Sequence, residues 1–145
     1  MMIMFRIKVM TKQHPTEDPK KIGTALKNII QGAVQKETIG NDIYLFIESK
    51  EPRVLDQLFE LLRQQRILDV ARKTLRNGIV ENSTYFYINK QVAFIGKINF
   101  CDEEGESPLG PIRIEIEYKN IDQLIDWLTP FTKNGSEVTL VTKFP

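Results

Sequence analysis

The chain contains few of the residues on which most metal and nucleophilic sites depend. It has one cysteine, Cys101, and one histidine, His14, in 145 residues. A single cysteine excludes an intramolecular disulfide, and these two residues alone cannot supply the ligands of an ordinary zinc site. No serine stands in a G-x-S-x-G motif. We therefore expect no catalytic residue, no cofactor and no metal site.

Phosphate loops and membrane segments are also lacking. Gly105 and Gly110 have the spacing of a phosphate loop, but Pro111 and Ile112 stand where a lysine and a serine or threonine are needed. No apolar run approaches the roughly eighteen residues that cross a bilayer, and the MMIM start lacks the basic region of a signal peptide. The net charge is only +1, so any argument from charge has to be local.

Hydrophobic periodicity predicts one α+β domain over residues 1–145, with residues 133–145 as a peripheral tail. Strands are predicted at residues 5–11, 34–39, 43–47, 82–89, 98–100, 111–118 and 138–141. Helices are predicted at residues 19–31, 52–64, 67–76, 90–96 and 121–128. The predicted helix caps are Thr16 or Asp18, Asn89 and Asn120. Such a mixture favours a mostly antiparallel sheet with helices packed on it.

Two strands give specific expectations. In residues 111–118, Ile112, Ile114 and Ile116 alternate with charged residues, so the three isoleucines should be buried and Glu115 exposed. Residues 43–47 are apolar on both faces of the strand. This second pattern is typical of a central strand in a sheet that is covered on much of both sides.

The helical pattern is interrupted near Gln64 and Gln65. If the helix that begins near Pro52 continued, Arg66 would fall on its apolar arc and Ile67 on its polar arc. The phase is therefore broken, which predicts a kink or turn followed by a new helix.

The segment after this break is the first candidate for function, because it concentrates positive charge. It contains five cations and one carboxylate: Arg63, Arg66, Arg72, Lys73 and Arg76, and Asp69. All but Arg63 share the predicted outer arc of the helix, where cations could contact successive phosphates, and Lys90 and Lys97 could extend the patch. The alternative is a solvated face on which Asp69 pairs with neighbouring cations.

Two further features are open to more than one interpretation. Tyr85 and Tyr87 lie on one face of a predicted strand, where exposed tyrosines could stack on unpaired bases. We expect instead that they pack beneath a helix. Asp102, Glu103, Glu104 and Glu106 form an acidic loop that could hold magnesium or perform acid–base chemistry. We expect a solvated turn there.

Four segments resemble a known family: RQQRILDVAR, FYINKQVAFIGKINFC, GESPLGPIRIEIE and IDWLTPFT. They are similar to an uncharacterised archaeal protein family that has been grouped with a predicted exosome-associated RNA-binding protein family. The resemblance runs from about Phe5 to Thr132. It implies a fold similar to that of the ribosomal protein that binds 5S ribosomal RNA, a cytoplasmic location and an RNA partner. It implies no known catalytic residues.

The resulting hypothesis is a small non-catalytic RNA-binding protein. The residues expected to contact phosphates are Arg63, Arg66, Arg72, Lys73, Arg76, Lys90 and Lys97. One alternative is a protein-interaction or assembly module that presents the same face to a protein complex. A second alternative is a magnesium-dependent enzyme that uses the carboxylates of residues 102–106.

Overall fold

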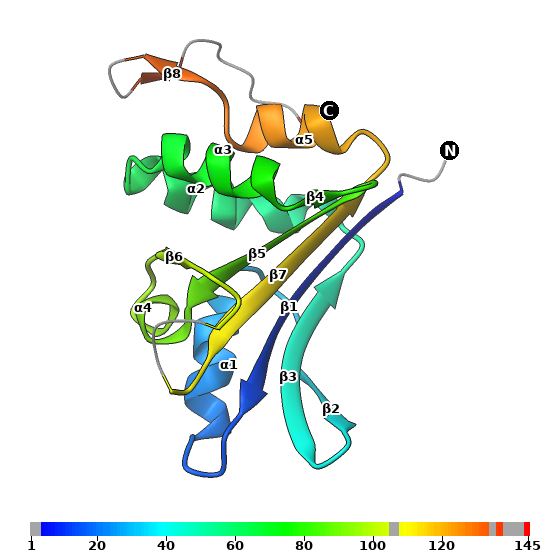
Figure 1. The fold of residues 1–145 in the computed structure, drawn as a ribbon, viewed down its shortest axis with the longest axis vertical. Coiled ribbons are helices and arrows are strands. Elements are labelled where there is room, and N and C mark those ends of the chain that lie inside the picture. The colour runs from blue at the N-terminus through cyan, green and yellow to red at the C-terminus, as the bar shows by residue number, and fades with distance from the viewer. Residues whose placement is uncertain (1–3, 105–107, 134–135, 138–143) are drawn as a thin grey trace.

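An antiparallel sheet organises the structure, a computed structural model that describes residues 4–104, 108–133, 136–137 and 144–145 (Figure 1). Its strands are β1 (Phe5–Gln13), β2 (Gln35–Ile39), β3 (Asp42–Ser49), β4 (Ile79–Val80), β5 (Ser83–Asn89), β6 (Phe100–Cys101) and β7 (Pro111–Tyr118). The strand order is β2-β3-β1-β7-β5-β4, and β6 also pairs with β5. Helices pack on this sheet, as the sequence predicts for an α+β fold.

The helices cover one face of the sheet. They are α1 (Pro19–Lys27), α2 (Leu55–Gln64), α3 (Leu68–Asn77), α4 (Lys90–Phe94) and α5 (Ile121–Leu128), and a single 3-10 turn, η1 (Pro52–Val54), precedes α2. Contacts join α1 to β1 and β3, α3 to β5, and α5 to β7. A short hairpin of β8 (Thr132–Lys133) and β9 (Ser136–Glu137) follows α5.

Strand register brings the apolar side chains of neighbouring strands onto this covered face. Ile7 lies opposite Ile116, and Val9 lies opposite Ile114. The three isoleucines of β7 are fully buried, as predicted. The expectation for Glu115 was wrong, because its side chain is only 13% exposed. The guanidinium of Arg6 on the neighbouring strand covers it and pairs with its carboxylate.

The expectation for β3 was also wrong. This strand lies between β1 and the edge strand β2 rather than at the centre of the sheet. Leu45 and Ile47 are buried, whereas Tyr44 and Phe46 point to the other face and are half-exposed. The Lys8 ammonium lies 4.5 Å from the centroid of the Phe46 ring. Partial cover by lysine stems and cation–π contact lets an uncovered face hold such aromatic residues.

The predicted break in the helical region is confirmed. α2 ends at Gln64 and α3 begins at Leu68. Between them Arg66 has φ of 57°, a left-handed conformation that an α-helix cannot contain. The side-chain amide of Gln65 donates to the carbonyl of Ile98 at 2.9 Å and accepts from its amide at 2.7 Å. The turn is thereby fixed against the segment that follows α4.

Two of the predicted caps form, and one does not. The carboxylate of Asp18 accepts from the Lys20 amide at 2.9 Å, and the Asn89 side chain accepts from the Val92 amide at 3.0 Å. Asn120 makes no side-chain capping bond at the start of α5. Because α1 ends at Lys27, the buried Ile29 and Ile30 lie in the turn after the helix.

Phe144 packs against the core, although most of the tail predicted at residues 133–145 lies outside the described residues. The ring of Phe144 lies 5.7 Å from that of Phe5, 5.0 Å from that of Tyr118 and 5.3 Å from that of Trp127, measured between centroids. This aromatic cluster joins β1, β7 and α5. The strand predicted at residues 138–141 lies outside the described residues.

Candidate functional site

Arg63, the first residue of the predicted basic face, binds carbonyl groups inside the molecule. Its guanidinium donates to the carbonyl of Phe59 at 3.1 Å, to that of Leu128 at 3.1 Å and to that of Trp127 at 3.3 Å. It also lies 3.3 Å from the centroid of the Phe59 ring. A cation at the carbonyl end of α5 is favourably placed in the field of that helix. Arg63 therefore ties α2 to α5.

Arg72 corrects the prediction of an outer arc, because it is 8% exposed. Its guanidinium donates to the carbonyl of Thr129 at 3.0 Å and lies 2.8 Å from the carboxylate of Asp126. The Phe131 ring stacks on it at 3.8 Å. Periodicity within one helix could not reveal that α5 and the residues after it cover this polar arc.

The neighbouring charges of α3 are satisfied in the same way. Arg76 lies 3.3 Å from the carboxylate of Asp122 on α5, and Asp69 accepts a hydrogen bond from the Thr132 hydroxyl. The alternative considered for this helix was that Asp69 pairs with the neighbouring cations. Asp69 instead accepts from Thr132, and α5 supplies the carboxylates beside Arg72 and Arg76.

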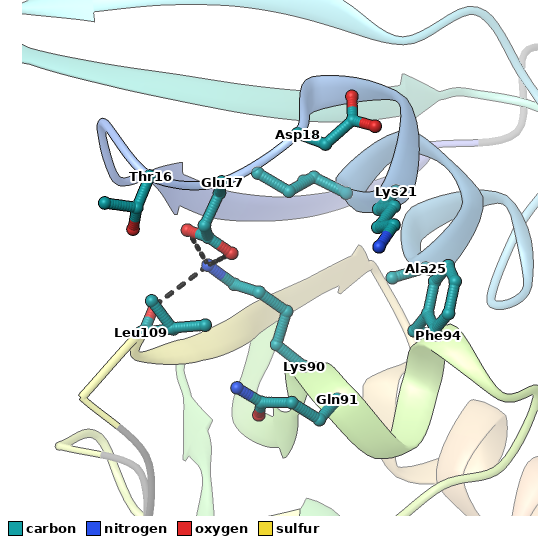
Figure 2. A pocket seen from close by; sticks show the side chains of 10 residues that line it. Thr16, Glu17, Asp18, Lys21, Ala25, Lys90, Gln91, Phe94 and Leu109 are labelled. Carbon is teal, nitrogen blue, oxygen red and sulfur yellow. Dashed lines mark hydrogen bonds and ion pairs between the residues drawn. The ribbon is translucent and has the colours of Figure 1, made fainter.

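Lys90 is also a structural residue rather than an exposed phosphate contact, because it is 4% exposed. Its ammonium donates to the carbonyl of Lys12 at 2.8 Å. It also donates to the carbonyl of Leu109 at 2.9 Å and to the carboxylate of Glu17 at 3.1 Å (Figure 2). These three acceptors match the three hydrogens of an ammonium group. Lys90 thus joins the end of β1, the turn before α1 and the loop before β7.

The Lys90–Glu17 pair has shifted protonation equilibria. Burial lowers the pKa of Lys90, and attraction to Glu17 only partly opposes this effect. Burial would raise the pKa of Glu17, but hydrogen bonds from the His14 backbone and from Lys90 outweigh it and hold the pKa below its usual value. Both groups are held by hydrogen bonds, so the pair acts as a fixed support.

A pocket of about 360 Å³ opens next to this pair, between α1, α4 and the residues before β7 (Figure 2). Its apolar lining comes from Ile22, Ala25, Phe94 and Leu109. Polar residues of the β1–α1 turn and of both helices complete the lining. The sequence offered no motif for this pocket, because its residues come together only when α4 packs on α1.

Other cations on the helical side are exposed and make no ion pair among the described residues. We call this set the helical cations: Lys20, Lys21, Lys27, Arg66, Lys73 and Lys97. Arg66 and Lys97 are the sequence neighbours of Gln65 and Ile98, which bond to each other. α1 lies beside α4 because the Asn28 amide donates to the carbonyl of Ala93 at 2.9 Å. Three of the predicted contacts, Arg66, Lys73 and Lys97, thus belong to the helical cations.

The lysines of α1 were missed from the sequence, although a signal was present. Within its nine residues α1 contains Lys20, Lys21 and Lys27 and no carboxylate. These lysines lie opposite a stripe of buried residues that includes Ile22 and Leu26. Because the polar arc of α1 carries charge of one sign, its lysines cannot form i,i+4 ion pairs within the helix. This absence of carboxylates was the signal in the sequence.

The opposite face of the sheet is uncovered by helices, and we call it the open sheet face. Tyr85 and Tyr87 lie on it and are half-exposed. The expectation that they pack beneath a helix was wrong, because Thr84, Phe86 and Ile88 occupy the face that the helices cover. The guanidinium of Arg113 lies 4.8 Å from the centroid of the Tyr85 ring.

The four described cations that β1 and β7 place on the open sheet face have carboxylate partners. Arg6 pairs with Glu115 and also lies 3.1 Å from Glu48. The other pairs are Lys8–Glu37 at 3.8 Å, Lys12–Asp42 at 3.2 Å and Arg113–Glu115 at 3.6 Å. This face therefore offers aromatic surface with balanced charge.

The acidic loop is exposed where the structure describes it. Asp102, Glu103 and Glu104 are exposed, and Glu106 lies outside the described residues. No three histidine, cysteine, aspartate or glutamate side chains gather into a metal site in the described part of the chain. Among the same residues, no helix is long and apolar enough to cross a membrane. The magnesium-dependent alternative stays a prediction.

Comparison with known proteins identifies the family to which this chain is similar. Residues 6–118 match a family model described as RNA binding. The chain is 44% identical over 133 residues to a UPF0201 protein of Sulfolobus acidocaldarius, covering 91% of this chain and 92% of that one. It is 41% identical over 138 residues to a UPF0201 protein of Pyrococcus horikoshii, covering 93% and 97%. The crystal structure of a UPF0201 protein from Methanococcus jannaschii has a TM-score of 0.81 at 32% identity and covers 92% of this chain and 99% of that one.

Proposed function

The chain belongs to the archaeal UPF0201 family, and we propose that it is a non-catalytic RNA-binding protein whose helical cations contact the phosphate backbone. The observation that carries the proposal is that the helical side keeps six exposed cations without an ion pair among the described residues, beside its paired Arg72, Arg76 and Lys90. The four described cations that β1 and β7 place on the open sheet face are all paired. The match of residues 6–118 to the RNA binding family model supports the choice of ligand.

Unpaired surface cations are what a polyanion requires. Each phosphate that is neutralised by a lysine or arginine releases condensed counterions, which makes binding favourable and dependent on salt. Cations that are already paired release fewer counterions, because their carboxylates must first be displaced. The helical cations are spread over α1, the α2–α3 turn, α3 and the residue after Gly96. Such a distribution suits a strand of RNA that runs across several helices.

The proposal extends to features that the family resemblance implies. They are a cytoplasmic location, a fold similar to that of the 5S rRNA-binding ribosomal protein, and a relationship to a predicted exosome-associated RNA-binding protein family. Of the seven contacts proposed from the sequence, Arg66, Lys73 and Lys97 are retained. Arg63, Arg72 and Lys90 are assigned to internal support, and Arg76 to its pair with Asp122.

A second candidate function is a protein-interaction module that uses the open sheet face. Four half-exposed aromatic residues favour it: Tyr44, Phe46, Tyr85 and Tyr87. Aromatic residues are enriched at the centre of protein interfaces, and balanced charge on such a face does not select for a polyanion. A protein partner bound there would leave the helical cations accessible.

The experiment that tests the proposal measures the affinity for labelled single-stranded RNA over a range of salt concentrations. Wild-type affinity should fall linearly on a log–log scale, by roughly 0.7 units for each phosphate contact. Replacing Lys73 and Lys97 by glutamine should make the slope shallower by about 1.4 units. Arg76→Gln is the matched control on α3, and it should change the slope less because Arg76 is paired with Asp122. An affinity that does not respond to salt would contradict the proposal.

A further inference from the structure

We propose that the pocket between α1 and α4 accepts one unstacked nucleobase of the bound RNA, with the ring of Phe94 as the stacking surface. The inference rests on the proposed function and extends it from phosphate contact to recognition of a base. Proteins that bind single-stranded RNA commonly stack splayed-out bases on aromatic side chains. In this pocket an aromatic ring and a cavity coincide.

The pocket has a size and a surface that suit a flat ring. Its volume is about 360 Å³, and Phe94 stands at its side next to Ala25, below Lys21 (Figure 2). The Phe94 side chain is 41% exposed, although the rest of the apolar lining is largely buried. A large ring left open to solvent at a cavity wall is available to stack on a ligand.

The Phe94 ring is attached to a backbone that the fold holds in place. The Asn28 side chain on α1 donates to the carbonyl of Ala93 at 2.9 Å and to that of Phe94 at 3.2 Å. At the other end of α4, the Asn89 side chain caps the helix. The stacking surface therefore exists before the ligand arrives, which reduces the entropy lost on binding.

The charges that line the pocket cancel. Two cations, Lys21 and Lys90, and two carboxylates, Glu17 and Asp18, line the pocket, and Lys90 is paired with Glu17. A cavity without net charge does not select a phosphate, so its occupant should be an uncharged group. The unpaired Lys21 lines the pocket and can bind the phosphate next to the inserted base.

The position of the pocket agrees with the path proposed for the backbone. Lys21 of α1 lines the pocket, whereas Lys20 and Lys27 lie on the other side of α1, beside Val34. Lys97 lies three residues after Phe94, and Arg66 follows Gln65, which bonds to Ile98. An RNA strand that runs from Lys21 toward Lys97 and Arg66 is proposed to pass over the pocket. The base that lies above it can then turn inward without breaking the phosphate contacts on either side.

The test compares two probes and three variants. One probe is a labelled pool of short single-stranded RNAs of random sequence, and the other is an abasic ribose-phosphate strand of the same length. Phe94→Leu keeps the apolar volume but removes the ring, and Phe94→Tyr keeps the ring. Ile95→Ala is the control, because Ile95 is 67% exposed and does not line the pocket. Thermal melting confirms that each variant is folded.

Loss of the ring should weaken binding of the base-bearing pool by about 5- to 100-fold, the effect of one base stacked on an aromatic side chain. Phe94→Tyr and Ile95→Ala should change the affinity by less than about twofold. The abasic strand should bind wild type and Phe94→Leu equally, because its phosphates remain and its bases are absent. The salt dependence of Phe94→Leu should match that of wild type.

Two results would overturn the inference and leave the proposed function standing. In the first, Phe94→Leu binds the base-bearing pool as wild type does, with normal salt dependence. In the second, Phe94→Leu weakens both probes by the same factor, which would assign Phe94 to support of the phosphate surface. Absence of any salt-dependent binding by wild type would overturn the proposed function and the inference together.

Discussion

The helical side and the open sheet face both display cations, but they differ in what surrounds those cations. On the open sheet face, Arg6, Lys8, Lys12 and Arg113 all lie within 4.0 Å of a carboxylate. Among the described residues, the helical cations have no such partner. The net charge of +1 does not reveal this difference in pairing between the two sets of cations. Location and pairing, rather than the total charge, show where a polyanion would bind.

Strand register explains why one face is paired. Arg6 pairs with Glu115 and Glu117 of the neighbouring strand β7, and Lys8 pairs with Glu37 of β2. Residues opposite each other in an antiparallel pair lie about 5 Å apart, and opposite charges there stabilise the sheet. In α1 the polar positions carry one sign of charge, so helical spacing supplies no partner. The unpaired charge is what remains for a ligand.

The largest effect should come from the apolar layer that separates the two sides. Ile114 is fully buried at the centre of β7, where it lies opposite Val9 and Phe86. Ile114→Ala should lower the free energy of unfolding by roughly 2–5 kcal/mol, because it leaves a cavity. Chemical denaturation measures the loss. A value below about 1 kcal/mol would mean that the two sides are not separated by a packed core at this strand.

Two adjacent residues of α3 sharpen the comparison, because one is buried and the other is exposed. Arg72→Gln should destabilise the protein by about 1–3 kcal/mol, since it leaves the carbonyl of Thr129 and the carboxylate of Asp126 without their partner. Lys73→Gln should change stability by less than about 0.5 kcal/mol. The effect on RNA binding should have the reverse order: Lys73→Gln should reduce the salt dependence of RNA affinity more than Arg72→Gln does. Equal effects of the two variants on stability would contradict the assignment of Arg72.

The buried pair of the helical side should give acid sensitivity. Because the folded pKa of Glu17 lies below its usual 4.5, its carboxylate stabilises the fold above that pH and the contribution is lost as pH falls through the folded pKa. Glu17→Gln should be less stable near neutrality and should lose less stability on acidification. Glu104→Gln, at an exposed position, is the control. Acid unfolding curves that are parallel for wild type and Glu17→Gln would contradict this role.

The smallest effect is expected from the paired cations of the open sheet face. Lys12 and Asp42 are 41% and 47% exposed, and ion pairs between exposed groups contribute about 0–1 kcal/mol. Lys12→Gln should therefore change the unfolding free energy by less than about 1 kcal/mol and leave RNA affinity nearly unchanged. A large loss of RNA affinity would move the binding surface to this face.

The sequence predicted most of the helices and strands because they depend on short-range patterns of apolar and polar residues. Alternation identified β7 and its buried isoleucines, and the change of helical phase identified the break at Arg66. The wrong predictions concern which other segments cover a given helix or strand. Nothing within α3 indicates that α5 covers Arg72, and nothing within β5 indicates that the face of Tyr85 is uncovered.

The candidate site was harder to predict for the same reason. Three of the seven proposed contacts are exposed and make no ion pair among the described residues, whereas Arg63, Arg72 and Lys90 bind carbonyl groups from distant segments. Lys90 is an example, because its acceptors come from Lys12, Glu17 and Leu109. Such long-range partners leave no local pattern in the sequence.

The central claim is that RNA binds the unpaired cations of the helical side, and one measurement tests it directly. The log–log salt slope of RNA binding is compared between wild type and two triple glutamine variants. One replaces Arg66, Lys73 and Lys97, and the other replaces three paired cations of the sheet: Lys8, Lys12 and Arg113. The account predicts a slope shallower by about 2 units for the helical variant and nearly unchanged for the sheet variant. The opposite order would contradict it.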